Sequence, residues 1–360
     1  MVRAAVLTGV RQMEIQEFPR PTIKHDDGLL KVDMVGVCGS DPHHYKGEDK
    51  VPFPLILGHE IVGTIDEVGE EFAKVKGVKK GDRVVVETYF GCGMCKPCVT
   101  GDYSKCTSRM GYGFQVGAAT PPYLWGAYSE YTYLPPRANV HKIDPNVPLE
   151  AGSLACAVLG NSIRWLNQIG GSKIGDTIVI LGCGQQGLGG VIVAKESGAS
   201  NIIVTGQSHD TARLEMAKEL GADHVINVDE VDAVEFVQDI TNGELADIAF
   251  DCSGATEAMQ SSVYMVKKHG TIVTSGIYTG KKGALDLDRI VMWEIIVKGT
   301  HTHLYDSVVP AIKLIESRKY PIEKLVTHKY TLDEAEKAVL CAAGELEGEF
   351  PIKVCIEPNK

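Results

Sequence analysis

Four cysteines within fifteen residues constrain the fold of this chain more than any other feature of its sequence. Cys92, Cys95, Cys98 and Cys106 follow the spacing C-x2-C-x2-C-x7-C, and the Gly and Pro residues between them suit tight turns. Four thiolates at such spacing close a tetrahedral shell around one ion and leave no position for a substrate. Iron–sulfur clusters usually have a different final spacing, and a redox C-x-x-C pair belongs beside a thioredoxin-like unit, which is not visible here. The spacing therefore predicts a structural zinc lobe over residues 91–106.

The composition places these cysteines in a large soluble chain. Its 360 residues exceed what a single core usually serves, so we expect two domains. The net charge of -11 and the lack of any Lys/Arg run argue against nucleic acid as a partner. No apolar segment has the length of a signal-peptide core or the roughly 20 residues of a membrane span. We therefore expect a cytoplasmic protein without a membrane partner, whose ten cysteines serve metal binding or catalysis rather than disulfides.

The apolar pattern changes near residue 150. Before it, short alternating runs such as LLKVDMVGVC and GDRVVVE, separated by Gly and Pro, predict a strand-rich antiparallel region. After it, six apolar runs alternate with helix-like segments such as TEAMQSSVYMVKKHG, which predicts an α/β fold with a doubly wound parallel sheet. Beyond residue 302 follow two helix-like segments and a last strand, FPIKVCIEP, that the pattern alone does not assign to either region.

A glycine-rich turn follows the apolar run DTIVIL. Gly182, Gly184 and Gly187 form G-x-G-x-x-G between this strand and a helix-like segment, where a dinucleotide-binding turn belongs. Gly182 permits the turn, Gly184 lets the backbone approach a pyrophosphate, and Gly187 lets the helix pack closely. The N–H groups of Gln185 and Gln186 would then face the phosphates from the helix N-terminus. The alternatives are a glycine-rich loop without a ligand, or a site for another adenosine compound such as S-adenosylmethionine.

A second set of metal-binding residue types is spread along the chain. Cys38 lies in VCGSDPHH, His59 in LGHE and Cys156 in LACAVLG. Three ligands are the number found when a catalytic zinc keeps its fourth position for water or substrate. A single Cys or His is more often a buried core residue than a ligand. The residues alone therefore leave both interpretations open.

Taken together and in this order, the motifs resemble the zinc-dependent medium-chain alcohol dehydrogenases. GVCGSD, LGHEIVGTI, the four-cysteine lobe and the strand with G-x-G-x-x-G carry the resemblance over essentially the whole chain. It implies a GroES-like, mainly-β catalytic domain made of residues 1–157 and 302–360. It also implies a Rossmann dinucleotide-binding domain, residues 158–301, inserted between them, and a homodimer or homotetramer.

The resemblance also implies roles at a catalytic zinc site. Cys38, His59 and Cys156 match its zinc ligands, and Glu60 matches an adjacent carboxylate that can approach the metal. Asp41 matches a carboxylate that orients the ligand histidine, as is general for metal-bound imidazole. Many polyol dehydrogenases of the family carry Glu-Pro where this chain has LACAVL. Here the cysteine favours direct ligation, in the manner of the alcohol dehydrogenases proper.

Ser40 and His43 match the hydroxyl and imidazole of the family's proton relay. Zinc would lower the pKa of a bound alcohol until the alkoxide becomes accessible, and hydride would then pass to the nicotinamide. The alternatives are a helix-capping role for Ser40 and a solvated loop position for His43. We therefore predict an oxidoreductase with two zinc ions per subunit that acts on an alcohol, a secondary alcohol or polyol, with NAD(P).

Three other functions are considered. The first is a dehydrogenase-like scaffold that has lost catalysis, against which the complete set of Cys38, Ser40, His59 and Cys156 argues. The second is a reductase of conjugated double bonds, known among relatives that lack the relay. The third is a zinc-containing protein for another adenosine ligand, such as a methyltransferase, against which the strand–turn–helix context argues.

Cofactor choice depends on the end of the second Rossmann strand, NIIVTGQSHDTARLE. NAD enzymes place an acidic residue there to bind the ribose 2′-hydroxyl, and Gly206 matches that position here. Ser208 could donate a hydrogen bond to a 2′-phosphate, and Arg213 or His209 could supply positive charge. Asp210 could instead replace the missing carboxylate. The sequence favours NADP over NAD.

Further residues are assigned only loosely. The segment 109–131 departs from the shorter stretch of many relatives, so we expect it to shape the substrate pocket with some of its aromatic residues, namely Tyr112, Phe114, Tyr123 or Trp125. His301 and His303 are interpreted as cofactor-side or interface loop residues, because a full ligand set exists without them.

Overall fold

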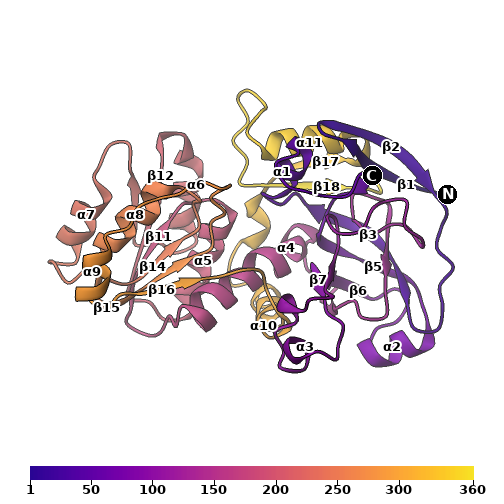
Figure 1. The fold of residues 1–360 in the computed structure, drawn as a ribbon, viewed down its shortest axis with the longest axis horizontal. Coiled ribbons are helices and arrows are strands. Elements are labelled where there is room, and N and C mark those ends of the chain that lie inside the picture. The colour runs from indigo at the N-terminus through magenta and orange to yellow at the C-terminus, as the bar shows by residue number, and fades with distance from the viewer. The chain divides into compact units, whose positions relative to one another are not determined.

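The computed structural model describes all 360 residues and divides into two compact units. The first unit consists of Met1–Ala157 and His303–Lys360, and the second of Val158–Thr302. The second unit is therefore an insertion in the sequence of the first (Figure 1).

The first unit is built mainly of β-structure. Its strands are β1 (Val2–Gly9), β2 (Gln12–Phe18), β3 (Gly28–Gly36), β4 (Leu55–Ile56), β5 (Glu60–Val68), β6 (Arg83–Val86), β7 (Tyr89–Phe90), β8 (Met110–Gly111), β9 (Tyr131–Leu134), β10 (Val140–Lys142), β17 (Val326–Thr331) and β18 (Lys353–Glu357). Its helices are α1 (Asp41–Lys46), α2 (Glu70–Lys76), α3 (Lys96–Val99), α4 (Leu149–Ser153), α10 (Tyr305–Glu316) and α11 (Ala335–Ala342).

A seven-stranded sheet organises this unit, with the order β10-β6-β5-β3-β18-β17 and with β9 also paired to β3. All of its pairings are antiparallel except β17 with β18. The strand-rich antiparallel region expected before residue 150 is thus confirmed. The last strand of the chain joins the same sheet, beside β3, which assigns the C-terminal segment that the apolar pattern left unplaced.

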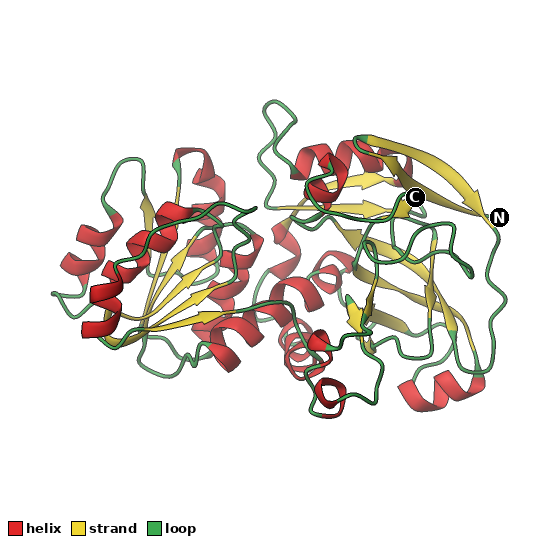
Figure 2. Cartoon of the chain, in the orientation of Figure 1, coloured by secondary structure: helices red, strands yellow, loops and turns green.

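The second unit is a six-stranded parallel sheet with helices on both sides (Figure 2). Its order is β13-β12-β11-β14-β15-β16, so the direction of connection reverses between β11 and β14. The predicted doubly wound α/β fold is confirmed. Its elements are β11 (Thr177–Leu181), α5 (Gln185–Glu196), β12 (Asn201–Gly206), α6 (Thr211–Glu219), β13 (His224–Asn227), α7 (Ala233–Ile240), β14 (Ala246–Asp251), α8 (Thr256–Met265), β15 (Val266–Thr274), α9 (Leu287–Met292) and β16 (Ile296–Gly299).

One expected helix is shorter than predicted. The segment 256–270 reads as a continuous helix, but α8 ends at Met265 and β15 begins at Val266. Val266 is already extended and pairs with Ala246 of β14, and His269 has a φ of 61°, a left-handed conformation that a helix cannot contain. The polar residues after Met265 therefore form the exposed start of a strand and not the last turn of a helix.

A π-helical stretch follows α4. Residues Ala155–Gly160 and Ile163–Ile169 adopt this rare wide winding, and Cys156 lies in the first of them. Single π turns occur frequently at functional sites, because they re-aim side chains within a helix.

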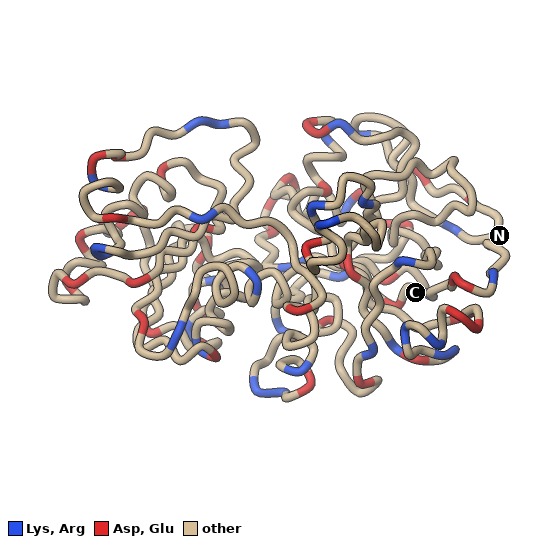
Figure 3. Tube along the Cα trace, turned by 60° about the horizontal axis from the view of Figure 1, so that its bottom comes forward, with Lys and Arg blue, Asp and Glu red and all other residues tan.

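The charged side chains show no basic concentration. Lys and Arg are interspersed with Asp and Glu along the Cα trace (Figure 3). None of the helices combines the length and the apolar character needed to cross a bilayer.

Candidate active site and metal centres

The four lobe cysteines converge in the structure. Their sulfur atoms all lie within 4.8 Å of one another, with 3.9 Å between Cys92 and Cys98 and 3.4 Å between Cys95 and Cys98. No disulfide links them. Hydrogen bonds from the backbone N–H groups of Met94 and Cys95 lower the pKa of Cys92 to about 6, whereas burial and the neighbouring thiols raise the pKa of Cys95 to about 12. The donor set and its spacing fit a closed, tetrahedral zinc site.

Glycines make this convergence possible. Gly93 and Gly101 have φ values of 79° and 88°, which glycine adopts without strain. A Cβ on Gly91 would stand 2.5 Å from Cys98 Sγ and 2.9 Å from the Cβ atom of Tyr103. The chain therefore packs directly against the thiolate cluster at Gly91.

A second cluster forms at the end of β3 and the start of β5. These strands pair antiparallel with Gly36 opposite Glu60, so the register brings Cys38 beside His59 and Glu60. One ligand atom from each of these three residues lies within 4.8 Å of the others. Cys156 is 2% exposed, but its sulfur is not within that distance of all three. The structure thus gathers three of the four residues predicted at the catalytic zinc, whereas Cys156, buried in the π-helical stretch, lies outside this set.

Asp41 supports this cluster from the first turn of α1. Its Oδ2 accepts hydrogen bonds of 2.9 Å from the backbone N–H of Cys38 and from the Tyr128 hydroxyl. Its Oδ1 lies 3.7 Å from His59 Nδ1, and both of these atoms are buried without a hydrogen-bond partner. A carboxylate beside one imidazole nitrogen is the arrangement expected when the other nitrogen binds a metal.

Lys353 is a buried cation at this cluster that the sequence analysis did not single out. Its side chain is 1% exposed, and its Nζ donates to the Glu60 carboxylate and, at 2.9 Å, to the carbonyl of Val37. Burial lowers the pKa of Lys353, but the Glu60 carboxylate and the Cys38 thiol outweigh this effect and raise it. No local signal could have revealed the pair, because 293 residues separate its members.

The electrostatics of this cluster favour a cation. Burial alone would lower the pKa of His59, but Cys38, Asp41 and Glu60 raise it to about 9. Buried Oε1 of Glu60 and Oδ1 of Asp41 have no hydrogen-bond partner. A thiol, an imidazole and a carboxylate are donors that zinc takes, so the residues present fit a zinc ion.

Ser40 and His43 lie beside the cluster, at the start of α1. Ser40 is the N-cap residue, but its hydroxyl makes no capping hydrogen bond. The side chain is therefore not used in the capping role that was its alternative. His43 pairs through Nδ1 with Glu48 at 2.5 Å and keeps about a third of its side chain exposed.

Only one of the four aromatic residues considered for the substrate pocket contacts a predicted ligand. The half-buried ring of Phe114 meets the His59 ring edge-on at 5.5 Å and the Tyr89 ring at 5.4 Å. Tyr112 is fully buried and its hydroxyl donates to the carbonyl of Tyr133. Trp125 packs against Tyr133, and Tyr123 against Phe18.

The two histidines after β16 separate between the units. His301 belongs to the second unit, where its carbonyl accepts a hydrogen bond of 2.9 Å from Arg164. His303 is buried in the first unit, where its Nε2 accepts the backbone N–H of Thr88 at 3.3 Å.

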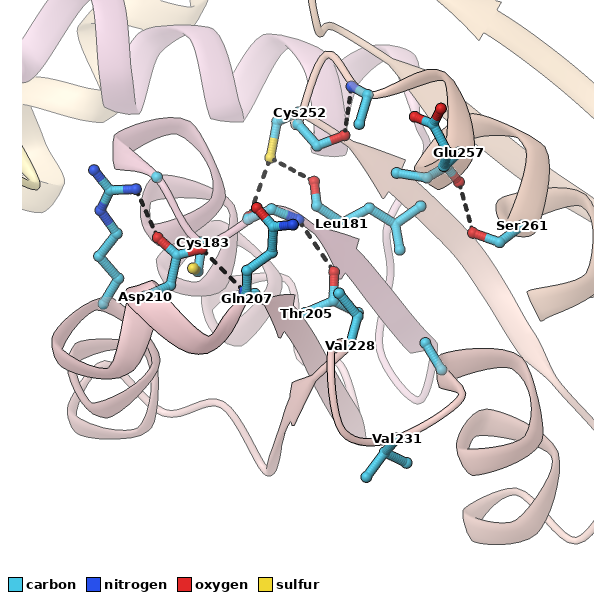
Figure 4. Close-up of a pocket in the computed structure, with 18 of the residues that line it drawn as sticks. Leu181, Cys183, Thr205, Gln207, Asp210, Val228, Val231, Cys252, Glu257 and Ser261 are labelled. Atoms are coloured by element: carbon cyan, nitrogen blue, oxygen red, sulfur yellow. Dashed lines mark hydrogen bonds and ion pairs between the residues drawn. The ribbon is translucent and has the colours of Figure 1, made fainter. Parts of the chain in front are cut away.

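The second unit contains a cavity of about 740 Å³ at the carboxyl ends of β11, β12 and β14 (Figure 4). Ligands of open α/β sheets bind at this edge, where the connection direction reverses. Gly182 turns the chain with a φ of 98°. A Cβ on Gly184 would have no atom within 4 Å, so the space beside this residue is open. A Cβ on Gly187 would stand 1.9 Å from the carbonyl oxygen of Gly182. The turn at Gly182 and the close packing at Gly187 agree with their predicted roles, and the approach of Gly184 to a pyrophosphate stays a prediction.

The predicted cofactor residues do not all line this cavity. Gly182, Gly184, Gly206 and Arg213 line it, together with residues not singled out from the sequence, among them Cys183, Thr205, Gln207, Cys252 and Ser253. The lining does not include Gln185, Gln186, Gly187 and Ser208. Ser208 instead donates its N–H to Asp229 Oδ2 at 2.7 Å.

Asp210 organises the wall of the cavity beside Gly206. Its Oδ2 accepts the N–H of Gln207 at 3.0 Å, and its Oδ1 accepts from Arg213 Nη1 at 2.7 Å (Figure 4). Both carboxylate oxygens are therefore engaged within the protein. The exposed His209 lines the same cavity.

Two family models match the chain. The alcohol dehydrogenase GroES-like domain matches residues 24–145, and the zinc-binding dehydrogenase domain matches residues 187–317.

Curated relatives match over nearly the full length. A sorbitol dehydrogenase of Halalkalibacterium halodurans is 35% identical, over 92% of this chain and 92% of the relative. A D-arabitol-phosphate dehydrogenase of Enterococcus avium is also 35% identical, over 98% of this chain and 95% of the relative.

Solved structures share the whole fold. An alcohol dehydrogenase of Thermotoga maritima superposes with a TM-score of 0.90 at 30% identity, covering 99% of both chains. A zinc-binding dehydrogenase of Sinorhizobium meliloti bound to NADP superposes with a TM-score of 0.87 at 25% identity, again over 99% of both.

Proposed function

We propose that this chain, which belongs to the zinc-dependent medium-chain alcohol dehydrogenases, oxidises a secondary alcohol or polyol with NAD(P) and holds two zinc ions per subunit. Its relatives support alcohol oxidoreduction in general. The observation that carries the finer proposal is the cluster of Cys38, His59 and Glu60, backed by Asp41 and separate from the closed lobe.

Each group in the first unit has a defined task. Cys38, His59 and Cys156 would hold zinc at the open site, and Glu60 would stand beside it. A zinc ion there would supply Lewis-acid chemistry that acidifies an alcohol, and a bound nicotinamide would supply the hydride acceptor. Ser40, whose hydroxyl is free of capping, accepts the alcohol proton. His43, partly exposed, passes it toward solvent.

The substrate class follows from relatives and from the wall around the site. The sorbitol and D-arabitol-phosphate dehydrogenases act on polyols, which carry secondary alcohols. Phe114 and Tyr89 add an aromatic wall next to His59, against which an apolar or C–H face of a substrate can pack.

NADP is the favoured cofactor. Gly206 places no carboxylate at the end of β12, and both oxygens of Asp210 already serve Gln207 and Arg213 rather than a ribose hydroxyl. His209 and Arg213 bring positive charge or hydrogen-bond donors to the same wall. Solved relatives hold NADP in one case and NADH in another, which supports a nicotinamide cofactor in general.

A homodimer or homotetramer is expected in solution. The strand β16 forms an edge of its sheet, and large apolar side chains of α9 and β16 are exposed. Leu287, Val291 and Met292 are between 67% and 79% exposed. Exposed apolar groups beside an open sheet edge are typical of a surface that another chain covers.

An absorbance assay with a panel of alcohols tests the proposal. The purified protein should generate reduced nicotinamide, followed by its near-ultraviolet absorbance, with secondary alcohols or polyols and with NADP in preference to NAD. Cys38→Ser should abolish turnover while the lobe keeps its zinc. Turnover of none of the alcohols would favour a scaffold, and turnover only with conjugated carbonyls would favour a double-bond reductase.

A further inference from the structure

A buried carboxylate in the first unit has no part in the proposed chemistry. Glu87 follows β6 directly and is 1% exposed. Its Oε1 pairs with His141 Nε2 at 2.7 Å, and its Oε2 accepts the hydroxyl of Tyr103 and, at 3.4 Å, the amide of Asn139. A carboxylate this deeply buried persists only with such partners, because an unpaired buried charge is strongly destabilising.

One of these partners belongs to the four-cysteine lobe. Tyr103 lies between Cys98 and Cys106, and its carbonyl accepts the N–H of Cys106 at 3.1 Å. Its hydroxyl also accepts the N–H of Tyr305 at 2.7 Å, so the phenol is held on both sides. The position of Tyr103, and therefore of the Glu87 contact, depends on the shape of the lobe.

The residue after Glu87 reaches the open metal site. Thr88 Oγ1 donates to the carbonyl of His59 at 3.2 Å, and the Thr88 N–H donates to His303 Nε2 at 3.3 Å. The N–H of Glu87 is itself fixed by the carbonyl of Asn139 at 3.0 Å. The backbone of a predicted ligand is thus held by the residue adjacent to Glu87.

We propose that Glu87 is a positioning residue that couples the four-cysteine lobe to the open metal site, an inference that rests on the proposed binding of zinc at Cys38, His59 and Cys156. Tyr103 anchors Glu87 from the lobe, Glu87 fixes the start of the segment that contains Thr88, and Thr88 fixes His59. Hydrogen-bonded partners behind metal ligands commonly change metal affinity when they are lost, by about 10- to 100-fold. Glu87 acts one residue further out, so we expect the lower end of this range.

The competing explanation is that Glu87 only satisfies buried polar groups and stabilises the unit. The chain offers a matched control for that role. Tyr133 is 7% exposed, and its hydroxyl donates to Asp27 Oδ2 at 2.8 Å, a buried tyrosine–carboxylate bond in the same unit. Loss of this bond should lower stability without changing the affinity of the open site for zinc.

The experiment compares zinc release from the full-length, zinc-loaded protein. A chromophoric zinc chelator at low concentration reports the release of each ion, and the open-site ion is identified as the one missing from Cys38→Ser. The variants are Tyr103→Phe, Glu87→Gln and their combination, with Tyr133→Phe as control. Urea unfolding of each variant gives its loss of stability.

We expect Tyr103→Phe and Glu87→Gln to release the open-site ion about tenfold faster than wild type, with the lobe ion still bound. Their combination should release it no faster than the stronger single variant, because both changes break one path. Tyr133→Phe should stay within about twofold of wild type even at equal loss of stability. Release from Tyr103→Phe and Glu87→Gln that matches Tyr133→Phe would overturn the coupling while leaving the proposed function intact. A wild type that holds no ion at Cys38 would overturn both.

Discussion

Replacing Lys353 by methionine should destabilise the first unit strongly. Methionine keeps most of the length and volume of the side chain but removes the ammonium group, which leaves Glu60 charged, 0% exposed and without its partner. Breaking a buried ion pair from one side costs about 3–5 kcal/mol. The Val37 carbonyl also loses its donor, which adds to the cost. Taking about 4 kcal/mol and about 2–4 °C per kcal/mol for a unit of this size, the midpoint of thermal unfolding should fall by about 10 °C.

Equilibrium urea unfolding, followed by circular dichroism, measures the loss. The control is Lys329→Met, which breaks an ion pair with Glu150 whose side chains are 43% and 24% exposed, and which should cost less than about 1 kcal/mol. Adding Glu60→Gln to Lys353→Met should recover a large part of the loss, because no charge is then left unpaired. A loss for Lys353→Met no larger than that of Lys329→Met would refute the assignment of this pair as a buried, mutually dependent one.

Three further outcomes are expected. Cys95→Ser should cost the protein one zinc ion and lower its unfolding temperature, since an incomplete thiolate shell no longer supplies folding energy; metal analysis that still finds two ions would contradict this. Ser40→Ala should retain both ions and bind cofactor normally but slow turnover by about 100-fold, most at low pH, and equal rates from about pH 6 to about pH 9 would exclude the relay role. Arg213→Ala should shift the ratio of dissociation constants toward NADH by about tenfold in a fluorescence titration, because it removes a cation and frees Asp210 for a ribose hydroxyl; an unchanged ratio would count against the NADP preference.

Local motifs carried most of what the sequence predicted. The lobe spacing and the glycine turn each lie within a few residues of one chain segment, so their geometry depends little on the rest of the fold. Cys38 and His59 became a pair only through the resemblance, because the register of β3 with β5 brings them together and no spacing rule encodes it.

The residues that the sequence did not reveal depend on contacts between distant parts of the chain. Lys353 meets Glu60, and Tyr103 meets Glu87, through tertiary contacts that a linear pattern does not reveal. The helix predicted over residues 256–270 was too long for a related reason, because the pairing of Val266 with Ala246 in the sheet overrides the local helix preference.

The structure also limits the choice of variants for testing cofactor preference. The sequence alone suggests Gly206→Asp, but a Cβ at this position would stand 2.6 Å from Cys183 Sγ, so the substitution would disturb the packing.

Because the first unit is interrupted in sequence, the two units cannot complete folding in the order in which they begin to emerge from the ribosome. The continuous second unit, Val158–Thr302, can fold as soon as it emerges, whereas β18 leaves the ribosome only after the whole of that unit. Until then Val35 and Gly36 of β3 lack their partners in β18, and Glu60 has no lysine beside it. A nascent chain stalled before Lys353 should therefore carry a finished nucleotide-binding unit attached to an unfinished, protease-sensitive one.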